Sequence, residues 1–174
     1  MSFFEKQFSM YICNIIFRNM AIAQFNHLSE EEKNLLFSTP AMVTYLIGGA
    51  DDDFDTKEEV QSTHLVRIRT SNGDPLLFDF YKHIEVNYFE QLDATVKKYE
   101  NIPVAERTDL IVKELSRLND ILPTIDDLYA RSLLKSLRSL AKAVAEASGG
   151  VFGFLEISYE EEHLMGLNMI TYNP

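Results

Sequence analysis

Cysteine, glycine and proline are all scarce in this chain of 174 residues, which contains one cysteine, seven glycines and five prolines. A single cysteine cannot form an intrachain disulfide, so nothing in the composition requires an oxidising compartment. We therefore expect a cytoplasmic protein in which Cys13, within an apolar segment, is a buried and unreactive thiol. The low glycine and proline content disfavours a turn-rich β-sandwich and favours helices.

Basic residues are also few, because the chain has 16 basic and 27 acidic side chains and a net charge of −11. Binding to a nucleic-acid backbone requires a positive field, so this balance argues against a nucleic-acid partner. It is compatible with a cation or with a basic protein partner. No run of about 18 uncharged apolar residues occurs, so we expect no membrane span.

Motifs of common enzyme classes are missing as well. The sequence has no Gly-x-Ser-x-Gly elbow, no Gly-x-Gly-x-x-Gly motif and no phosphate-binding loop. Cys13 has no neighbouring group that would activate it as a nucleophile. We therefore expect a protein that is not an enzyme.

Helical periodicity is what the sequence has in abundance, and it predicts an all-α fold of about seven or eight helices in a single domain. A first helix is expected over Ser2–Phe25, although Met20 can itself open a domain, so we divide the chain into an extension (1–19) and a domain (20–174). Ser29 and Glu32 form a capping box that predicts a helix through Phe37. Pro40 is expected to open the next helix, which the apolar run 41–48 predicts to be buried.

The middle of the chain allows two interpretations. A helix starting at Asp55 is expected to reach about Arg69, followed by a turn over 70–75. The residues on either side of this turn alternate as a β-hairpin would, but helical spacing continues for more than twenty residues after it. We therefore predict a helix from the apolar positions Leu77, Tyr81, Ile84, Tyr88, Leu92, Val96 and Tyr99.

Three further helices complete the prediction. The first carries leucines from Leu110 to Leu122 and ends at Pro123. Thr124 is expected to cap the second, which runs to Ser148 before a glycine pair. The third is expected to start after Ser158 and to end near Ile170.

An acidic stretch follows the buried helix, and its side chains are candidates for a cation site. Asp51, Asp53 and Asp55 occupy alternate positions, as the first three ligands of an EF-hand do. The EF-hand pattern then fails, because Thr56 and Ser62 stand where glycine and a bidentate glutamate are required. Another kind of cation site and a solvated acidic loop, favoured by the dipole at a helix N-terminus, both remain open.

A second corner near the end of the chain repeats this design. Residues 54–58 and 157–161 each place an apolar residue before a capping residue, with glutamate three positions after the cap. A helix rich in small residues precedes each corner. Residues 50–58 also resemble the Ala-Asp-Gly-x-Ile-Ser-x-x-Glu signature of the TerB-like (tellurite-resistance protein B-like) domains, with Asp52 and Phe54 replacing the usual glycine and isoleucine.

The resemblance implies an all-helical domain of two pseudo-symmetric halves and a role in tellurite or general stress response. It also implies that acidic corner residues hold a divalent cation, such as Ca²⁺ or Mg²⁺. The candidate ligands are Asp51, Asp53, Asp55 and Glu58, completed by Glu160 and Glu161 from the second corner. The alternative function is a ligand-free helical adaptor or oligomerisation module that engages protein partners or itself through the aromatic helix at 2–25.

Overall fold

Helix α2 is the element against which much of the fold packs. The computed structural model of the protein describes residues 22–51, 56–147 and 163–172. Its elements are η1 (Ala23–Phe25), α2 (Glu30–Gly48), η2 (Gly49–Asp51), α3 (Thr56–Asn72), η3 (Pro75–Leu77), α4 (Phe78–Tyr99), α5 (Val104–Ser116), α6 (Leu118–Ile121), η4 (Leu122–Thr124) and α7 (Asp127–Ala147), where η denotes a 3₁₀ turn. Every regular element within these ranges is helical, so the predicted all-α class is confirmed.

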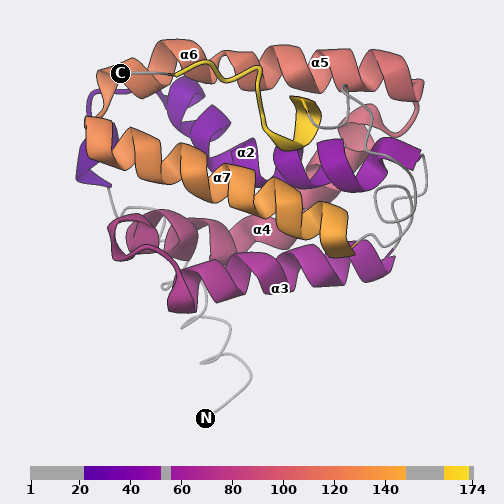
Figure 1. The fold of residues 1–174 in the computed structure, drawn as a ribbon, viewed down its shortest axis with the longest axis horizontal. Coiled ribbons are helices and arrows are strands. Elements are labelled where there is room, and N and C mark those ends of the chain that lie inside the picture. The colour runs from indigo at the N-terminus through magenta and orange to yellow at the C-terminus, as the bar shows by residue number, and fades with distance from the viewer. Residues whose placement is uncertain (1–21, 52–55, 148–162, 173–174) are drawn as a thin grey trace, which may run out of the picture.

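Six α-helices, α2 to α7, lie within the described ranges, and the predicted total of seven or eight stays a prediction. The helix predicted over 2–25 lies almost entirely outside these ranges, as does the start of the last predicted helix. In Figure 1, α5 and α6 run along one edge and α3 along the opposite edge, with α2, α4 and α7 between them. Helix α2 packs on α4, α7 and α5, and α3 packs on α4 and α7.

The start of α2 confirms the predicted capping box. The Ser29 hydroxyl accepts a hydrogen bond from the Glu32 amide at 3.3 Å, and the Ser29 amide donates to the Glu32 carboxylate at 2.7 Å. Two backbone donors that the helix itself cannot pair are satisfied in this way. The Ser29 hydroxyl also lowers the pKa of Glu32, because it hydrogen-bonds the charged carboxylate.

The prediction of a helix break before Pro40 is wrong, because α2 continues through Pro40 without interruption. Proline lacks the N–H that would donate to the Leu36 carbonyl, and an interior proline costs a helix about 3 kcal/mol. Helix α2 is buried at every position from Thr39 to Gly48, so continuing it removes a large apolar surface from water. Tertiary packing therefore outweighs the local preference at Pro40.

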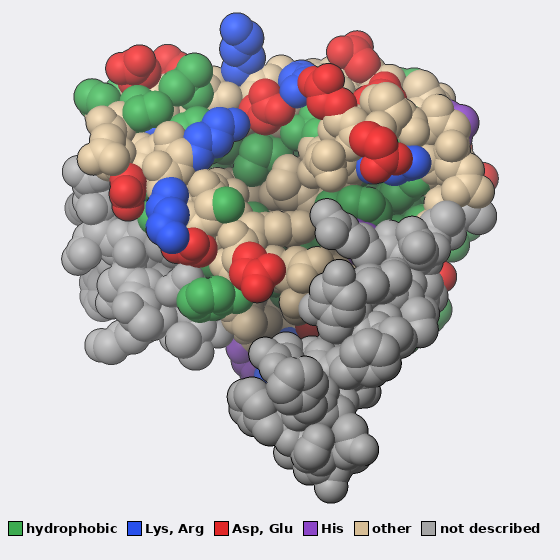
Figure 2. All heavy atoms as spheres, turned by 180° about the vertical axis from the view of Figure 1, so that it is seen from behind, with side chains coloured by type: hydrophobic (Ala, Val, Ile, Leu, Met, Phe, Trp, Pro, Cys, Tyr) green, Lys and Arg blue, Asp and Glu red, His purple; other side chains and the backbone are tan. Residues whose placement is uncertain are grey.

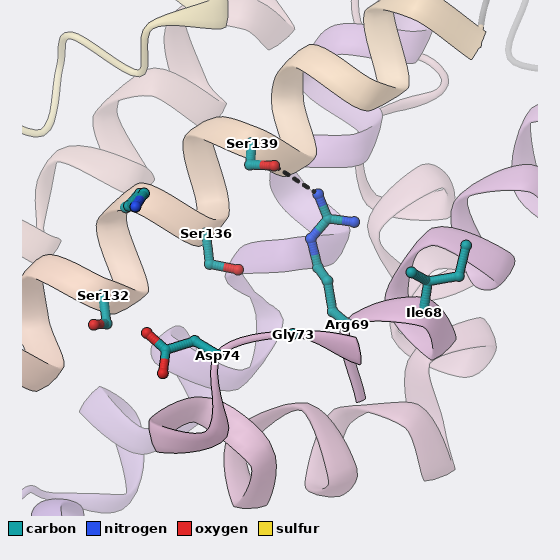
Figure 3. A pocket seen from close by; sticks show the side chains of 8 residues that line it. Ile68, Arg69, Gly73, Asp74, Ser132, Ser136 and Ser139 are labelled. Atoms are coloured by element: carbon teal, nitrogen blue, oxygen red, sulfur yellow. Dashed lines mark hydrogen bonds between the residues drawn. The ribbon is translucent and has the colours of Figure 1, made fainter. Parts of the chain in front are cut away.

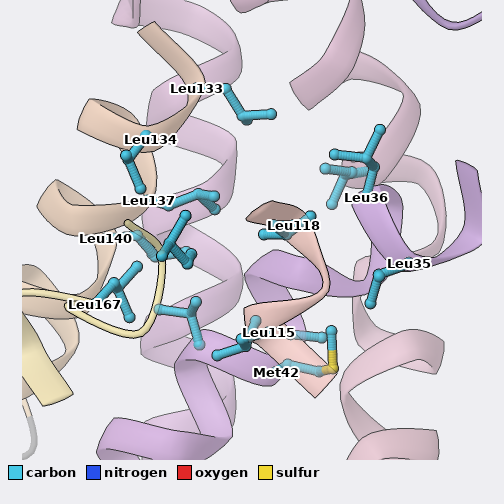
Figure 4. Packing of buried hydrophobic residues seen from close by; sticks show 14 of the residues in the cluster. Leu35, Leu36, Met42, Leu115, Leu118, Leu133, Leu134, Leu137, Leu140 and Leu167 are labelled. Carbon is cyan, nitrogen blue, oxygen red and sulfur yellow. The ribbon is translucent and has the colours of Figure 1, made fainter. Parts of the chain in front are cut away.

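The helix predicted after the turn is confirmed as α4, and the hairpin alternative is wrong. Its predicted apolar positions are buried, apart from Val96, which is partly buried and packs against the core. Tyr88 extends the packing with a hydrogen bond of 2.7 Å to Thr44 of α2. Figure 4 shows Leu35 and Leu36 of α2 facing the leucines of α7, with Leu115 and Leu118 between them.

The turn between α3 and α4 is shorter than predicted. Helix α3 runs to Asn72, past the expected end near Arg69, and only the residues around Gly73 leave the helix. A Cβ atom on Gly73 would lie 2.3 Å from the Arg69 carbonyl oxygen, so this close turn requires glycine. Asp74 then accepts a hydrogen bond from the Leu76 amide at 3.0 Å and caps η3, which leads into α4.

Two boundaries nearer the C-terminus also differ from the predictions. The helix expected to run without interruption to Pro123 is divided at Arg117 into α5 and α6. Thr124 does not cap α7, because its hydroxyl donates to the Ile121 carbonyl and Ile125 is extended. Asp126 is the cap instead, since its carboxylate accepts from the Tyr129 amide at 3.0 Å.

The chain ends in a short segment that packs on α6 and α7. Residues 163–165 are helical, but the helix stops well before Ile170, and Leu167 takes a φ of 47°. Leu167 and Ile170 are buried, which offsets the cost of this left-handed conformation. The Asn119 side chain donates to the Met169 carbonyl at 2.9 Å and accepts from the Thr171 amide at 2.7 Å. The segment is thus fixed by apolar and polar contacts together.

Replacing Ser29 with alanine should destabilise the protein by about 1 kcal/mol, the usual effect of losing a serine cap. The pKa of Glu32 should rise toward its ordinary value of 4.5. A carboxylate whose pKa is lowered in the folded protein stabilises the fold at pH values above 4.5, and this contribution is lost as the pH falls. The difference in unfolding free energy between the variant and the wild type should therefore narrow below pH 4.5. Urea unfolding at several pH values measures this. Ser71→Ala, which removes an exposed hydroxyl on α3, should change stability by less than about 0.5 kcal/mol.

Candidate functional site

The predicted cation ligands fall mostly outside the part of the chain that the structure describes. Asp51 is the last residue of η2, and Glu58 is in the first turn of α3. Asp53, Asp55, Glu160 and Glu161 lie in the ranges that are not described. The ligand set therefore stays a prediction. Among the described residues, no group of three or more His, Cys, Asp or Glu side chains is arranged to hold a metal ion.

Three helix ends next to the two acidic corners lie toward the same end of the molecule. In Figure 1, α2 ends, α3 begins and α7 ends at the right-hand side. Helices α3 and α7 are also in direct contact. The chain therefore enters both corners from one end of the helical bundle.

A buried arginine lies beside the first corner. Arg107 of α5 is only 4% exposed, and its guanidinium donates a hydrogen bond to the carbonyl of Gly49. The guanidinium carbon is also 5.4 Å from the centre of the Tyr45 ring, a cation–π arrangement. A fixed positive charge is thus held next to η2, where the acidic stretch begins. Arg107 therefore fixes the backbone at Gly49, two positions before the acidic stretch begins at Asp51.

The sequence carries no local signal for Arg107. Its partner Gly49 is 58 positions away, and Arg107 occupies the first part of a helix where an exposed charge is ordinary. Gly49 has its own packing role, because a Cβ atom there would lie 3.0 Å from the Tyr45 ring. Because Gly49 has no side chain, the Tyr45 ring can lie against the Gly49 backbone, whose carbonyl accepts the hydrogen bond from Arg107.

A separate cavity of about 390 Å³ lies between α3 and α7, near the turn at Gly73. Its lining residues are Ile68, Arg69, Gly73, Asp74, Ser132, Lys135, Ser136 and Ser139. Figure 3 shows Arg69 reaching from α3 toward Ser139 of α7, with Asp74 on the side nearer Ser132. Three serines, two basic groups and one carboxylate therefore surround a single hollow. None of these residues was predicted as a site, because α3 and α7 are distant in sequence and only packing brings them together.

Hydrogen bonds hold the walls of this cavity in place. One Arg69 nitrogen donates to the Leu65 carbonyl at 3.0 Å, and another lies 3.4 Å from the Ser139 hydroxyl. The Tyr81 hydroxyl is 2.6 Å from that of Ser136. Burial raises the pKa of Tyr81, so its hydroxyl stays neutral and serves as a hydrogen-bonding group. The lining residues include no histidine or cysteine that would activate a nucleophile.

Charges are mixed on the outer surface. Figure 2 shows the face opposite to that of Figure 1, where acidic and basic side chains are interspersed along the upper edge. This face offers no extended basic surface among the described residues for a nucleic-acid backbone. Among the helices that the structure describes, none has both the length and the apolar character needed to cross a membrane.

The chain matches no family model, and no curated protein or solved structure is significantly similar to it.

Replacing Arg107 with methionine should destabilise the protein by about 1–3 kcal/mol, because the buried Gly49 carbonyl loses its charged donor. Arg67→Met is a matched control, since Arg67 is exposed and pairs with Glu85 at 3.5 Å. An exposed pair contributes about 0–1 kcal/mol, so the control should stay within that range. Urea unfolding compares the two variants. Equal stability losses would show that Arg107 does not hold the corner.

Proposed function

We propose that this chain is a non-catalytic helical binding protein of the TerB-like kind, with two related halves and a divalent-cation site at their acidic corners. The ligands would come from Asp51, Asp53, Asp55 and Glu58, completed by Glu160 and Glu161. The observation that supports the proposal is that α2 ends, α3 begins and α7 ends toward one end of the bundle. A role in tellurite or general stress response belongs to the same proposal.

The charge balance of the corner supports a cation of hard character. Residues 51–59 carry six carboxylates and one lysine, and Arg107 holds the backbone at Gly49 just before them. These two positive charges cannot neutralise six carboxylates, so the stretch keeps a substantial negative charge. Oxygen ligands at this density suit Ca²⁺ or Mg²⁺.

Calorimetric titration with Ca²⁺ and Mg²⁺ tests the cation site. The wild-type protein should bind one of these ions, and the double variant Asp51→Asn/Asp55→Asn should lose most of the binding, since carboxylates supply the ligand charge. The control Glu90→Gln/Asp109→Asn removes the same charge from exposed positions on α4 and α5 and should bind as the wild type does. Equal heats of cation binding for the wild type and the Asp51→Asn/Asp55→Asn variant would rule out the proposed cation site.

A second candidate function is self-association through a helical face. Phe78, Val86 and Phe89 of α4 are 49%, 38% and 55% exposed. Their spacing of eight and three positions brings them to one side of the helix, where large apolar side chains gather. An exposed apolar face of this kind favours an adaptor or oligomerisation module. The aromatic segment 2–25, expected to form such an interface, lies mostly outside the described residues.

Sedimentation analysis over a range of concentrations tests this second function. If the α4 face mediates self-association, Phe78→Gln/Phe89→Gln should lower the average mass at high concentration, because the buried apolar area is lost. Leu128→Gln is the matched control, since Leu128 is 64% exposed on α7. A wild-type protein that stays monomeric throughout would rule the self-association out.

A further inference from the structure

The cavity between α3 and α7 has charges of both signs around a hydroxyl-lined centre. Arg69 and Lys135 supply positive charge, and Asp74 supplies negative charge. In Figure 3, Arg69 and Asp74 approach the cavity from different sides, with Ser136 of α7 lying between them. The two charged ends are therefore separated within one hollow. The hollow has a volume of about 390 Å³ and is open to solvent, because Asp74, Lys135 and Ser139 in its lining are exposed, so it has room for a small ligand bound at the surface.

The basic end is suited to a carboxylate. Arg69 hydrogen-bonds the Leu65 carbonyl and the Ser139 hydroxyl and also interacts with the Tyr81 hydroxyl, so at least two of the five N–H donors of its guanidinium remain. The bond to Ser139 is long at 3.4 Å, so an anionic oxygen would replace this hydroxyl as acceptor. A guanidinium is planar and binds a carboxylate through two parallel hydrogen bonds. Lys135 adds a second positive charge to the lining.

The acidic end of the cavity determines which second group the ligand can carry besides its carboxylate. Asp74 uses one carboxylate oxygen, Oδ1, to cap η3 through the Leu76 amide, which fixes the orientation of the group. A ligand with two negative charges would be repelled by this carboxylate, whereas an ammonium group would be attracted to it. Ser132 and Ser136 add hydroxyls that donate or accept between the two ends.

We propose that this cavity binds a small zwitterion of the α-amino-acid class. The ligand carboxylate lies on Arg69, the ammonium group faces Asp74, and the serines of α7 line the space between them. Ile68 supplies an apolar wall for a short side chain. The cavity involves the C-terminal end of α3, whereas the acidic corner leads into its N-terminal end, so this site is independent of the proposed cation site.

Titration followed by amide NMR shifts tests the proposal with L-alanine, L-lactate and inorganic phosphate as probes. L-Alanine and L-lactate have nearly the same shape and differ in whether an ammonium or a hydroxyl group accompanies the carboxylate. L-Alanine should bind saturably and shift the amides of Gly73 and Ser136, and L-lactate should bind at least about tenfold more weakly because it cannot pair with Asp74.

Three variants and one control separate the contributions of Arg69 and Asp74 to L-alanine binding. Arg69→Gln should weaken L-alanine binding at least about tenfold, and Arg69→Lys should weaken it less because it keeps the charge but loses the planar fork. Asp74→Asn retains a good cap for η3 and should bring L-alanine and L-lactate to similar affinities. Arg67→Gln, on the same helix but outside the cavity, should bind L-alanine as the wild type does.

Three results would overturn the proposal. The first is no saturable shift with L-alanine, and the second is unchanged L-alanine binding in Arg69→Gln that folds normally by circular dichroism. The third is binding of inorganic phosphate or L-lactate as tightly as L-alanine, which would show an anion site without selection for the ammonium group. Because none of these titrations includes a divalent cation, their outcome does not depend on the acidic corner.

Discussion

Burial of the second half of α2 is the constraint on which the rest of the structure depends. Thr39 to Gly48 are buried throughout, between α4, α7 and α5. A helix that is apolar on almost every side must be covered on almost every side, so other helices, here α4 and α7, have to pack against it. The same burial explains why Pro40 lies inside a continuous helix. It also explains why Tyr88 brings a hydroxyl into the core only where Thr44 can pair with it.

The covering helices create two chemically different ends. At one end, α2 finishes, α3 begins and α7 finishes, and Arg107 holds the backbone at Gly49 next to the acidic stretch. Toward the other end, the tight turn at Gly73 brings Asp74 close to the serines of α7, and Arg69 completes the cavity. Both regions combine fixed charges with hydrogen-bonding groups, and the cavity's lining includes no histidine or cysteine. This chemistry is suited to binding.

Strong local signals in the sequence predicted much of the fold. The capping box of Ser29 and Glu32 acts within one helical turn, so it forms whatever surrounds it. The apolar spacing of 77–99 continues for more than five turns, which is long enough to outweigh a few alternating residues. Boundaries were less predictable where two local signals competed, as Thr124 and Asp126 did for the start of α7. The cavity was not predictable, because Arg69 and Ser139 are 70 positions apart and only the packing of α3 on α7 brings them together.

The sequence by itself determined the helical class, the long periodic helices, the strong caps and the acidic character of the corner. Each of these depends on residues within a turn or two of one another, where spacing and side-chain chemistry act directly. Tertiary structure alone decided that α2 passes through Pro40, that Arg107 is buried against Gly49 and that the α3–α7 cavity exists. These features depend on the free energy of covering α2, a sum over contacts between segments far apart in the chain, which no local pattern contains.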